Sequence, residues 1–148
     1  MIDHFNLNRF LLAQIQEEKS YGYDDALREI KLGKKQTHWM WYIFPQFIGL
    51  GTSYDSTRYA IKSREEALAY LNHPILGQRL IEISTVLLNI ENQSAYSIFD
   101  SPDDVKLKSS MTLFNSVQNE KKVFELVLDK YYFSSKCVKT LRYLGVLK

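Results

Sequence analysis

The sequence has little of what would form disulfides, linkers or membrane spans. Its one cysteine, Cys137, excludes an internal disulfide and a multi-cysteine metal site. Only six glycines and three prolines punctuate the 148 residues, and no stretch has the composition of a linker, a repeat or a low-complexity tract. The longest wholly apolar run, residues 39–45, is far shorter than a bilayer span requires.

The chain also lacks an excess of charge of either sign. A formal net charge of +2 gives no reason to expect nucleic acid or an anionic membrane surface as a partner. The first residues, Met-Ile-Asp-His-Phe, have neither the basic start nor the long apolar stretch of a signal peptide. We therefore expect a cytoplasmic protein that does not enter a membrane.

What is present is the composition of a folded globular protein. Apolar residues make up 45% of the chain and charged residues 24%, and the length suffices to bury a core. We expect one domain over residues 1–148. The apolar spacing predicts an all-α fold, a single multihelical domain of about seven to nine helices.

Local start signals predict where several of these helices begin. Ser63 and Glu66 form the pattern of a capping box, and Pro74 suits the first turn of the helix that follows. Asp103 and Asp104 favour a helix start after a proline. Together with the apolar spacing, such signals predict helices over about 8–18, 24–33, 63–72, 74–90, 102–117, 121–131 and 136–144.

Residues 37–44 can be read as a strand or as a helix. The aromatic residues and Ile43 favour a strand, but a lone strand has no partner to pair with. We therefore expect a buried helix that ends near Pro45 and is polar only in its first turn, where His38 lies.

This aromatic segment also holds the first candidate site residues. A core needs neither His38 nor Gln46. His38 is either a hydrogen-bonded structural residue or an acid, a base or a hydrogen-bond donor to a ligand. Trp39 and Trp41, the only tryptophans of the chain, are core residues on the simplest reading. On a helix they would point roughly 200° apart, so at most one is expected to face a pocket, where it could stack on a nucleotide base.

The predicted helix after Pro102 holds the second group. At about 100° per residue, Asp103, Lys106 and Ser110 fall within the arc of its apolar residues. The other side of this helix carries Lys108, Ser109 and Thr112. Either this end of the helix protrudes into water, or the three side chains within the apolar arc line a cavity between helices. In the second case Lys106 would bind an anion or act as an acid–base group, with Asp103 as its partner.

The sequence offers no metal or cofactor site. Its three histidines lack the spacing of metal ligands, and no phosphate-binding loop is present. Basic residues occur in two groups, and a face joining them would be the surface for nucleic acid, a hypothesis that we rank last. The groups are Lys31, Lys34 and Lys35, and, at the C-terminus, Lys136, Lys139, Arg142 and Lys148.

Two blocks of the sequence are distinctive, His-Trp-Met-Trp-Tyr-Ile-Phe-Pro-Gln at 38–46 and Ser-Ser-Met-Thr-Leu-Phe at 109–114. With shorter segments such as Ser-Pro-Asp-Asp at 101–104, they resemble domain-of-unknown-function family 1810, a group of small, mainly bacterial proteins. The resemblance runs in order along nearly the whole chain and is weakest after Phe133. It implies a multihelical all-α fold and no established activity. Some members carry a calpastatin label, but nothing in this chain looks like a protease-inhibitor repeat.

Our first hypothesis is a pocket between the His38 helix and the Pro102 helix that binds a small anionic ligand, with nucleotide-like ligands included. The alternatives are an interaction module without a pocket and an enzyme acting on a nucleotide-like substrate. The oligomeric state stays open. The candidate site residues are His38, Trp39, Trp41, Gln46, Asp103, Lys106 and Ser110.

Overall fold

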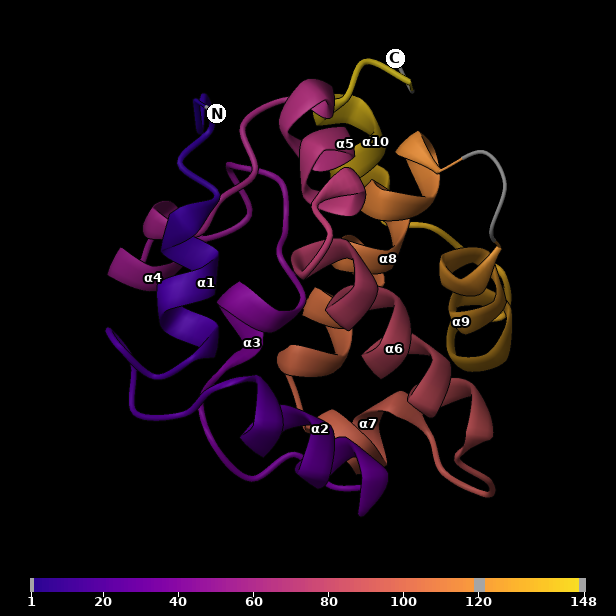
Figure 1. Cartoon of the computed structure of the whole chain (residues 1–148). Coiled ribbons are helices and arrows are strands. Elements are labelled where there is room, and N and C mark those ends of the chain that lie inside the picture. The colour runs from indigo at the N-terminus through magenta and orange to yellow at the C-terminus, as the bar shows by residue number, and fades with distance from the viewer. Residues whose placement is uncertain (1, 119–121, 147–148) are drawn as a thin grey trace.

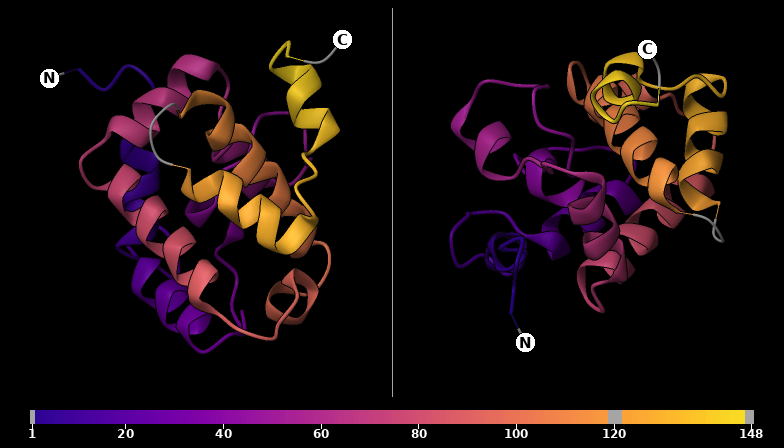
Figure 2. Two further views of the ribbon diagram at one scale, coloured as in Figure 1. Left: turned by 90° about the vertical axis from the view of Figure 1, so that its right-hand side faces the viewer. Right: turned by 90° about the horizontal axis from the view of Figure 1, so that it is seen from above.

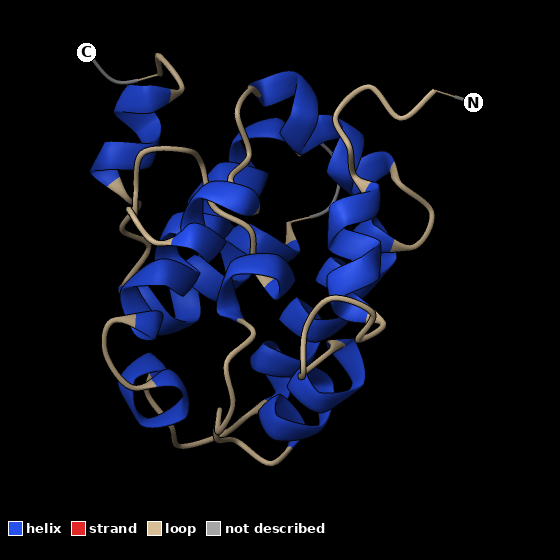
Figure 3. Ribbon diagram, turned by 90° about the vertical axis from the view of Figure 1, so that its left-hand side faces the viewer, coloured by secondary structure: helices blue, strands red, loops and turns tan. Residues whose placement is uncertain are grey.

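A computed structural model of the chain describes residues 2–118 and 122–146, and within them ten α-helices form (Figures 1 and 3). They are α1 (Asn8–Gln14), α2 (Tyr23–Lys31), α3 (Met40–Ile43), α4 (Tyr54–Arg58), α5 (Arg64–Asn72), α6 (Leu76–Asn89), α7 (Ala95–Phe99), α8 (Asp103–Val117), α9 (Val123–Tyr132) and α10 (Val138–Tyr143). The predicted all-α fold is confirmed, with slightly more helices than expected. None of the described helices has the length and apolar character needed to cross a membrane.

Two of the predicted helix starts have the local chemistry that the sequence indicates. Ser63 caps α5, because its hydroxyl accepts a hydrogen bond from the Glu66 N–H at 3.0 Å. The second half of the capping box is replaced, since the Glu66 carboxylate accepts from the Lys62 N–H and from Arg9 instead. Asp103 lies in the acidic first turn of α8, where the helix dipole favours carboxylates.

Other predicted boundaries are wrong. α1 ends at Gln14 rather than near residue 18, and Gln16 takes a φ of 65° that a helix cannot continue. α3 is a single turn, so the predicted helix over 37–44 is much shorter and His38 precedes it. The five-residue helices α4 and α7 have no counterpart in the prediction, because such short elements leave no periodic apolar pattern.

The helices α6 and α8 form the centre of the fold. Both α5 and α9 pack against both of them, while α2 contacts α6, and α7 and α10 contact α8. Figure 2 shows α6, α8 and α9 as neighbours, with α10 on the outer side of α8. Buried aromatic rings connect α1, α5, α8 and α9 through the core, with centroids 5.0, 5.4 and 5.9 Å apart from one ring to the next. These rings are Phe10, Tyr70, Phe114 and Phe124.

The side of α8 opposite its apolar arc is buried as well. Ser109 and Thr112 are covered by the start of α10, where the Ser109 hydroxyl lies 3.2 Å from the Cys137 sulfur and the Thr112 hydroxyl accepts from the Cys137 N–H at 2.9 Å. A single-helix angular analysis does not reveal this, because it does not show which faces a later helix covers. α8 is therefore packed on both sides over residues 109–114, whereas its N-terminal turn is partly accessible.

The C-terminal end of α6 is closed by a lysine from α9. The Lys130 ammonium lies 3.2 Å from the Leu87 carbonyl oxygen and 2.8 Å from that of Leu88, and it also contacts the Ile90 carbonyl.

We expect Lys130→Met to lower the free energy of unfolding by about 1.5 kcal/mol, because it removes charged donors from carbonyl groups that the helix leaves free. Urea unfolding measures the loss. Lys136→Met, outside any helix, is the control, and an equal effect of both changes would contradict the capping role.

Candidate functional site

A small cavity lies between α3, α4, the N-terminal turn of α8 and the segment that leads into α3. It has a volume of about 80 Å³. Its lining combines two tryptophans with groups of both charges. The lining residues are Lys35, His38, Trp39, Met40, Trp41, Tyr42, Asp55, Asp103 and Lys106.

Two lysines meet at one carboxylate in this cavity. The Lys106 nitrogen lies 3.1 Å from one oxygen of Asp103, and the Lys35 nitrogen lies 2.9 Å from the other. Each ammonium group also lies over an indole ring, Lys106 at 4.7 Å from the Trp41 ring centroid and Lys35 at 4.9 Å from that of Trp39. Cation–π attraction and the shared carboxylate together hold both charges in place.

The lysines keep hydrogen-bonding capacity that the protein does not use. An ammonium group has three N–H bonds. With one N–H counted for each contact, Lys106 spends one on Asp103, while Lys35 spends one on Asp103 and one on the Thr37 carbonyl oxygen at 2.6 Å. Three N–H bonds therefore remain without an acceptor among the described residues. Two positive charges around one negative charge also leave the cluster with a net positive charge.

Two other polar groups that line the cavity are neutral or already paired. Asp55 forms an ion pair with Lys19 at 2.6 Å, so it adds no uncompensated negative charge. Burial raises the pKa of the Tyr42 phenol. The protonated phenol donates to the carbonyl oxygens of Tyr21 at 2.5 Å and His38 at 3.0 Å. Asp55 and Tyr42 therefore do not neutralise the positive charge of the lysine cluster.

His38 lies at the rim with its side chain exposed. Its backbone carbonyl is used by Tyr42, but its imidazole makes no hydrogen bond to another described residue. The structure therefore gives no support to a hydrogen-bonded structural role for this side chain. The imidazole is free to meet a molecule that approaches the cavity.

The segment before α3 is held by a buried carboxylate of α2. Glu29 accepts hydrogen bonds from the Gln36 N–H at 2.6 Å, the Thr37 N–H at 2.9 Å, the Thr37 hydroxyl at 2.6 Å and the Trp39 indole N–H at 3.0 Å. Burial alone would raise the pKa of the Glu29 carboxyl, but these bonds outweigh it and hold that pKa below its ordinary value.

The lowered pKa has a consequence for stability in acid. The ionised Glu29 carboxylate stabilises the folded state above the ordinary carboxyl pKa of 4.5. This contribution is lost as the pH falls through the lowered pKa of the folded state. We therefore expect the ionised Glu29 carboxylate to hold the segment that carries His38 and Trp39 at neutral pH, and this support to be lost only in acid.

The structure brings five of the seven predicted site residues to this cavity and leaves two elsewhere. His38, Trp39, Trp41, Asp103 and Lys106 line it. The other two, Gln46 and Ser110, are buried away from it.

Gln46 and Ser110 lie deeper because of the elements that hold them. Ser110 is one helical turn beyond Lys106, where α8 has entered the core, and Gln46 follows α3, where its carbonyl accepts from the Ile61 N–H at 2.9 Å. The Gln46 side-chain nitrogen and the Ser110 hydroxyl have no hydrogen-bond partner among the described residues.

The expectation that at most one tryptophan faces the pocket is wrong. Both Trp39 and Trp41 border it. Trp39 precedes α3 with φ −147° and ψ 6°, so the angular spacing of a helix does not apply between the two residues. Trp39 is buried with its indole N–H on Glu29, whereas Trp41 is half-buried.

Four lining residues were not among the predicted site residues: Lys35, Met40, Tyr42 and Asp55. Lys35 looks like part of a solvated basic cluster, yet its side chain is only 7% exposed because it pairs with Asp103. Its neighbour Lys34 pairs with Asp100 at 3.0 Å. The predicted basic face for nucleic acid is therefore not supported by this cluster, and Lys148 lies outside the described residues. The nearness of Lys35 to the aromatic block is the one sequence signal that could have drawn attention to it.

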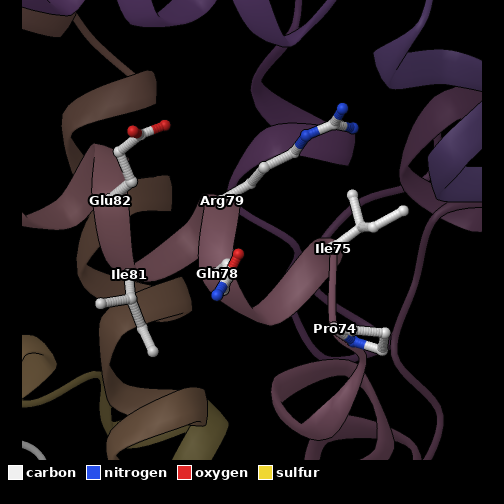
Figure 4. A pocket seen from close by; sticks show the side chains of 6 residues that line it. All are labelled: Pro74, Ile75, Gln78, Arg79, Ile81 and Glu82. Atoms are coloured by element: carbon white, nitrogen blue, oxygen red, sulfur yellow. The ribbon is translucent and has the colours of Figure 1, made fainter.

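Larger surface hollows exist. In one of about 480 Å³, the side chains of Arg9, Arg58 and Glu66 already form ion pairs. One of about 380 Å³ runs along the start of α6, and Figure 4 shows its side chains spreading from one stretch of chain in several directions. Its lining residues are Pro74, Ile75, Gln78, Arg79, Ile81 and Glu82. No group of three His, Cys, Asp or Glu side chains in the described ranges could hold a metal ion. The lysine cluster near the two tryptophans is thus the stronger candidate.

The comparisons with known proteins cover the whole fold. The family described as "Protein of unknown function (DUF1810)" matches residues 4–144. The crystal structure of the conserved hypothetical protein Rv1873 from Mycobacterium tuberculosis is 42% identical, with a TM-score of 0.91, over 97% of this chain and 99% of that chain. No curated protein matches the chain. These similarities specify a fold and no activity.

Proposed function

The chain belongs to the DUF1810 family of proteins of unknown function, a membership that specifies no reaction, and we propose that it binds a small anionic ligand in the cavity between α3, α4 and α8. One observation carries the proposal: Lys35 and Lys106 share a single carboxylate, Asp103. The cluster keeps a net positive charge and three unused N–H donors. Anions recognised by ammonium groups accept such donors in charge-assisted hydrogen bonds.

The positions of the lysines favour an anion over a cation. Each indole presents one face to an ammonium group of the protein itself, Lys106 over Trp41 and Lys35 over Trp39. An added cation would find these attractive positions taken and would be repelled by the charges that take them. An anion would instead complete the coordination of both lysines.

The size of the cavity limits what can enter it. At about 80 Å³ it is smaller than the roughly 300–1,000 Å³ of pockets that enclose whole ligands. A phosphate or carboxylate group fits such a volume, while the rest of a ligand stays outside. The half-buried Trp41 and the exposed His38 lie where that part would rest. A nucleotide-like ligand, bound by its phosphates and stacked on an aromatic ring, suits this arrangement.

Lys106→Met tests the proposal, since methionine keeps the apolar stem and removes the charge. We expect pyrophosphate to raise the Tm of the unaltered protein, because a ligand that binds only the folded state stabilises it by mass action. The variant should bind pyrophosphate at least about tenfold more weakly, which is the effect of losing one charge-assisted hydrogen bond. Calorimetric titration with phosphate, pyrophosphate and a nucleoside triphosphate measures the affinities.

Lys108→Met is the matched control, because Lys108 lies on the same helix and does not line the cavity. It should leave pyrophosphate affinity unchanged. The proposal fails if none of the three probes binds the unaltered protein at millimolar concentration. It also fails if the variants at positions 106 and 108 bind equally well.

We also propose that residues 1–148 fold as one domain. A single cluster of buried apolar side chains, reaching from Leu7 to Leu128, supports this. One cooperative unfolding transition, with equal calorimetric and van't Hoff enthalpies, is the expected result. Two separable transitions would contradict it.

A further inference from the structure

We propose that Glu29 is a positioning residue for the anion cavity, because it fixes the segment 35–39 that carries Lys35, His38 and Trp39 to the cavity wall. The inference deepens the proposed function and rests on it. Glu29 itself does not line the cavity. It lies on α2 and acts through the groups that it holds.

The Glu29 carboxylate is surrounded by donors of this one segment. One of its oxygens accepts from the N–H groups of Gln36 and Thr37 and from the indole of Trp39, and the other accepts from the Thr37 hydroxyl. No lysine or arginine of the described residues forms an ion pair with it, in contrast to Glu66, which pairs with Arg9. The carboxylate is thus held by backbone and side-chain donors of the residues that it orders.

Thr37 links this anchor to Lys35. Its N–H and hydroxyl donate to Glu29, while its carbonyl oxygen accepts from the Lys35 ammonium at 2.6 Å. A rotation of this residue would move the acceptor on which Lys35 rests. One face of the segment is therefore attached to α2 and the other to the cation of the cavity.

Trp39 makes a second link of the same kind. Its indole N–H donates to Glu29 at 3.0 Å, and its ring lies 4.9 Å from the Lys35 ammonium nitrogen. Both supports of Lys35 other than Asp103 are thus oriented by a single carboxylate. Without that carboxylate, Asp103 would be the one contact of the Lys35 ammonium group described above whose orientation does not depend on Glu29.

Glu29→Gln tests the inference, because the amide keeps the shape of the side chain and offers one acceptor oxygen and an NH₂ group where four donors converge. We expect pyrophosphate to bind about tenfold more weakly, at the lower end of the effect that outer partners have at metal sites. The indole N–H resonance of Trp39 in a ¹H–¹⁵N spectrum should shift strongly, while that of Trp41 moves less. Thr37→Val, which removes one of the four donors, should weaken binding by a smaller factor of about three.

Glu66→Gln is the matched control, because it alters another buried carboxylate that accepts hydrogen bonds, in a part of the fold that does not line the cavity. It should lower the Tm and leave both pyrophosphate affinity and the Trp39 resonance unchanged. A merely structural Glu29 would likewise lower the Tm and leave pyrophosphate affinity unchanged, so an unchanged affinity for Glu29→Gln overturns the inference.

The outcomes separate this inference from the proposed function. If Lys106→Met loses pyrophosphate binding and Glu29→Gln keeps it, the anion site stands and the positioning role fails. If the unaltered protein binds neither pyrophosphate nor phosphate, the proposed function fails. In that case the Trp39 resonance still tests the positioning of the segment, and an unchanged resonance in Glu29→Gln overturns it. If Glu29→Gln does not fold, the same measurement is made on Thr37→Val.

Discussion

Replacing Gly77 with alanine is expected to lower the free energy of unfolding by at least about 3 kcal/mol, which is the upper part of the range for overpacked sites. A Cβ atom at this position would lie 1.9 Å from the Leu71 carbonyl oxygen and 2.7 Å from the Leu71 carbonyl carbon. Both are backbone atoms of α5, so no side chain can rotate away. The first turn of α6 and the last turn of α5 would have to separate, and both helices pack in the centre of the fold.

Urea unfolding measures this loss, and Gly145→Ala provides the contrast. A Cβ at Gly145 meets no described atom within 4 Å, although its φ of +77° disfavours alanine. Gly145→Ala should lower the free energy of unfolding by only about 1 kcal/mol, because alanine is strained in the left-handed backbone conformation. Equal losses for the two variants would show that the close approach of α5 and α6 is not a constraint.

Removing the Arg9 guanidinium is the second change with a large expected effect. The side chain is buried and forms an ion pair with Glu66 at 2.6 Å. Its other N–H groups donate to backbone carbonyls at 2.7 to 2.9 Å, so the group ties α1 to the chain before α5. These carbonyls belong to Phe5, Asn6, Arg58 and Ala60. We expect Arg9→Met to cost about 3–5 kcal/mol, because it leaves a buried carboxylate without its cation.

A double variant distinguishes the stranded charge from the lost packing. Adding Glu66→Leu to Arg9→Met removes the uncompensated carboxylate, so part of the lost stability should return. Guanidinium or urea unfolding of the single and double variants gives the coupling energy. A decrease in the free energy of unfolding of less than about 1 kcal/mol for Arg9→Met would contradict the role assigned to this ion pair, because such a value is typical of exposed pairs.

The sequence predicted the long elements and missed those set by distant contacts. Ser63 and the acidic turn at Asp103 are local signals, and the helices that they start are present. The segment before α3 is not the predicted helix, and Glu29 on α2 holds it through the N–H groups of Gln36 and Thr37. Nothing near residue 37 in the sequence indicates this distant acceptor.

The residues of the candidate site also fall into those that local geometry predicts and those that only distant contacts bring together. Lys106 and Asp103 were predicted from their angle on one helix, since that angle depends only on local geometry. Lys35, in the segment between α2 and α3, and Asp55, on α4, reach the cavity through tertiary packing, which no local pattern records. The angular argument also included Ser110, because it measures direction around the helix and not depth along it.

The two indoles give the cavity a built-in optical signal. Trp39 and Trp41 are the only tryptophans of the chain, and both border this one space. Indole emission from the unlabelled protein therefore comes from the cavity and from nowhere else. Each indole also carries an ammonium group on its face, so a molecule that moves either lysine changes the surroundings of that indole and hence its fluorescence. Candidate ligands can thus be titrated without a dye, a tag or a knowledge of the reaction.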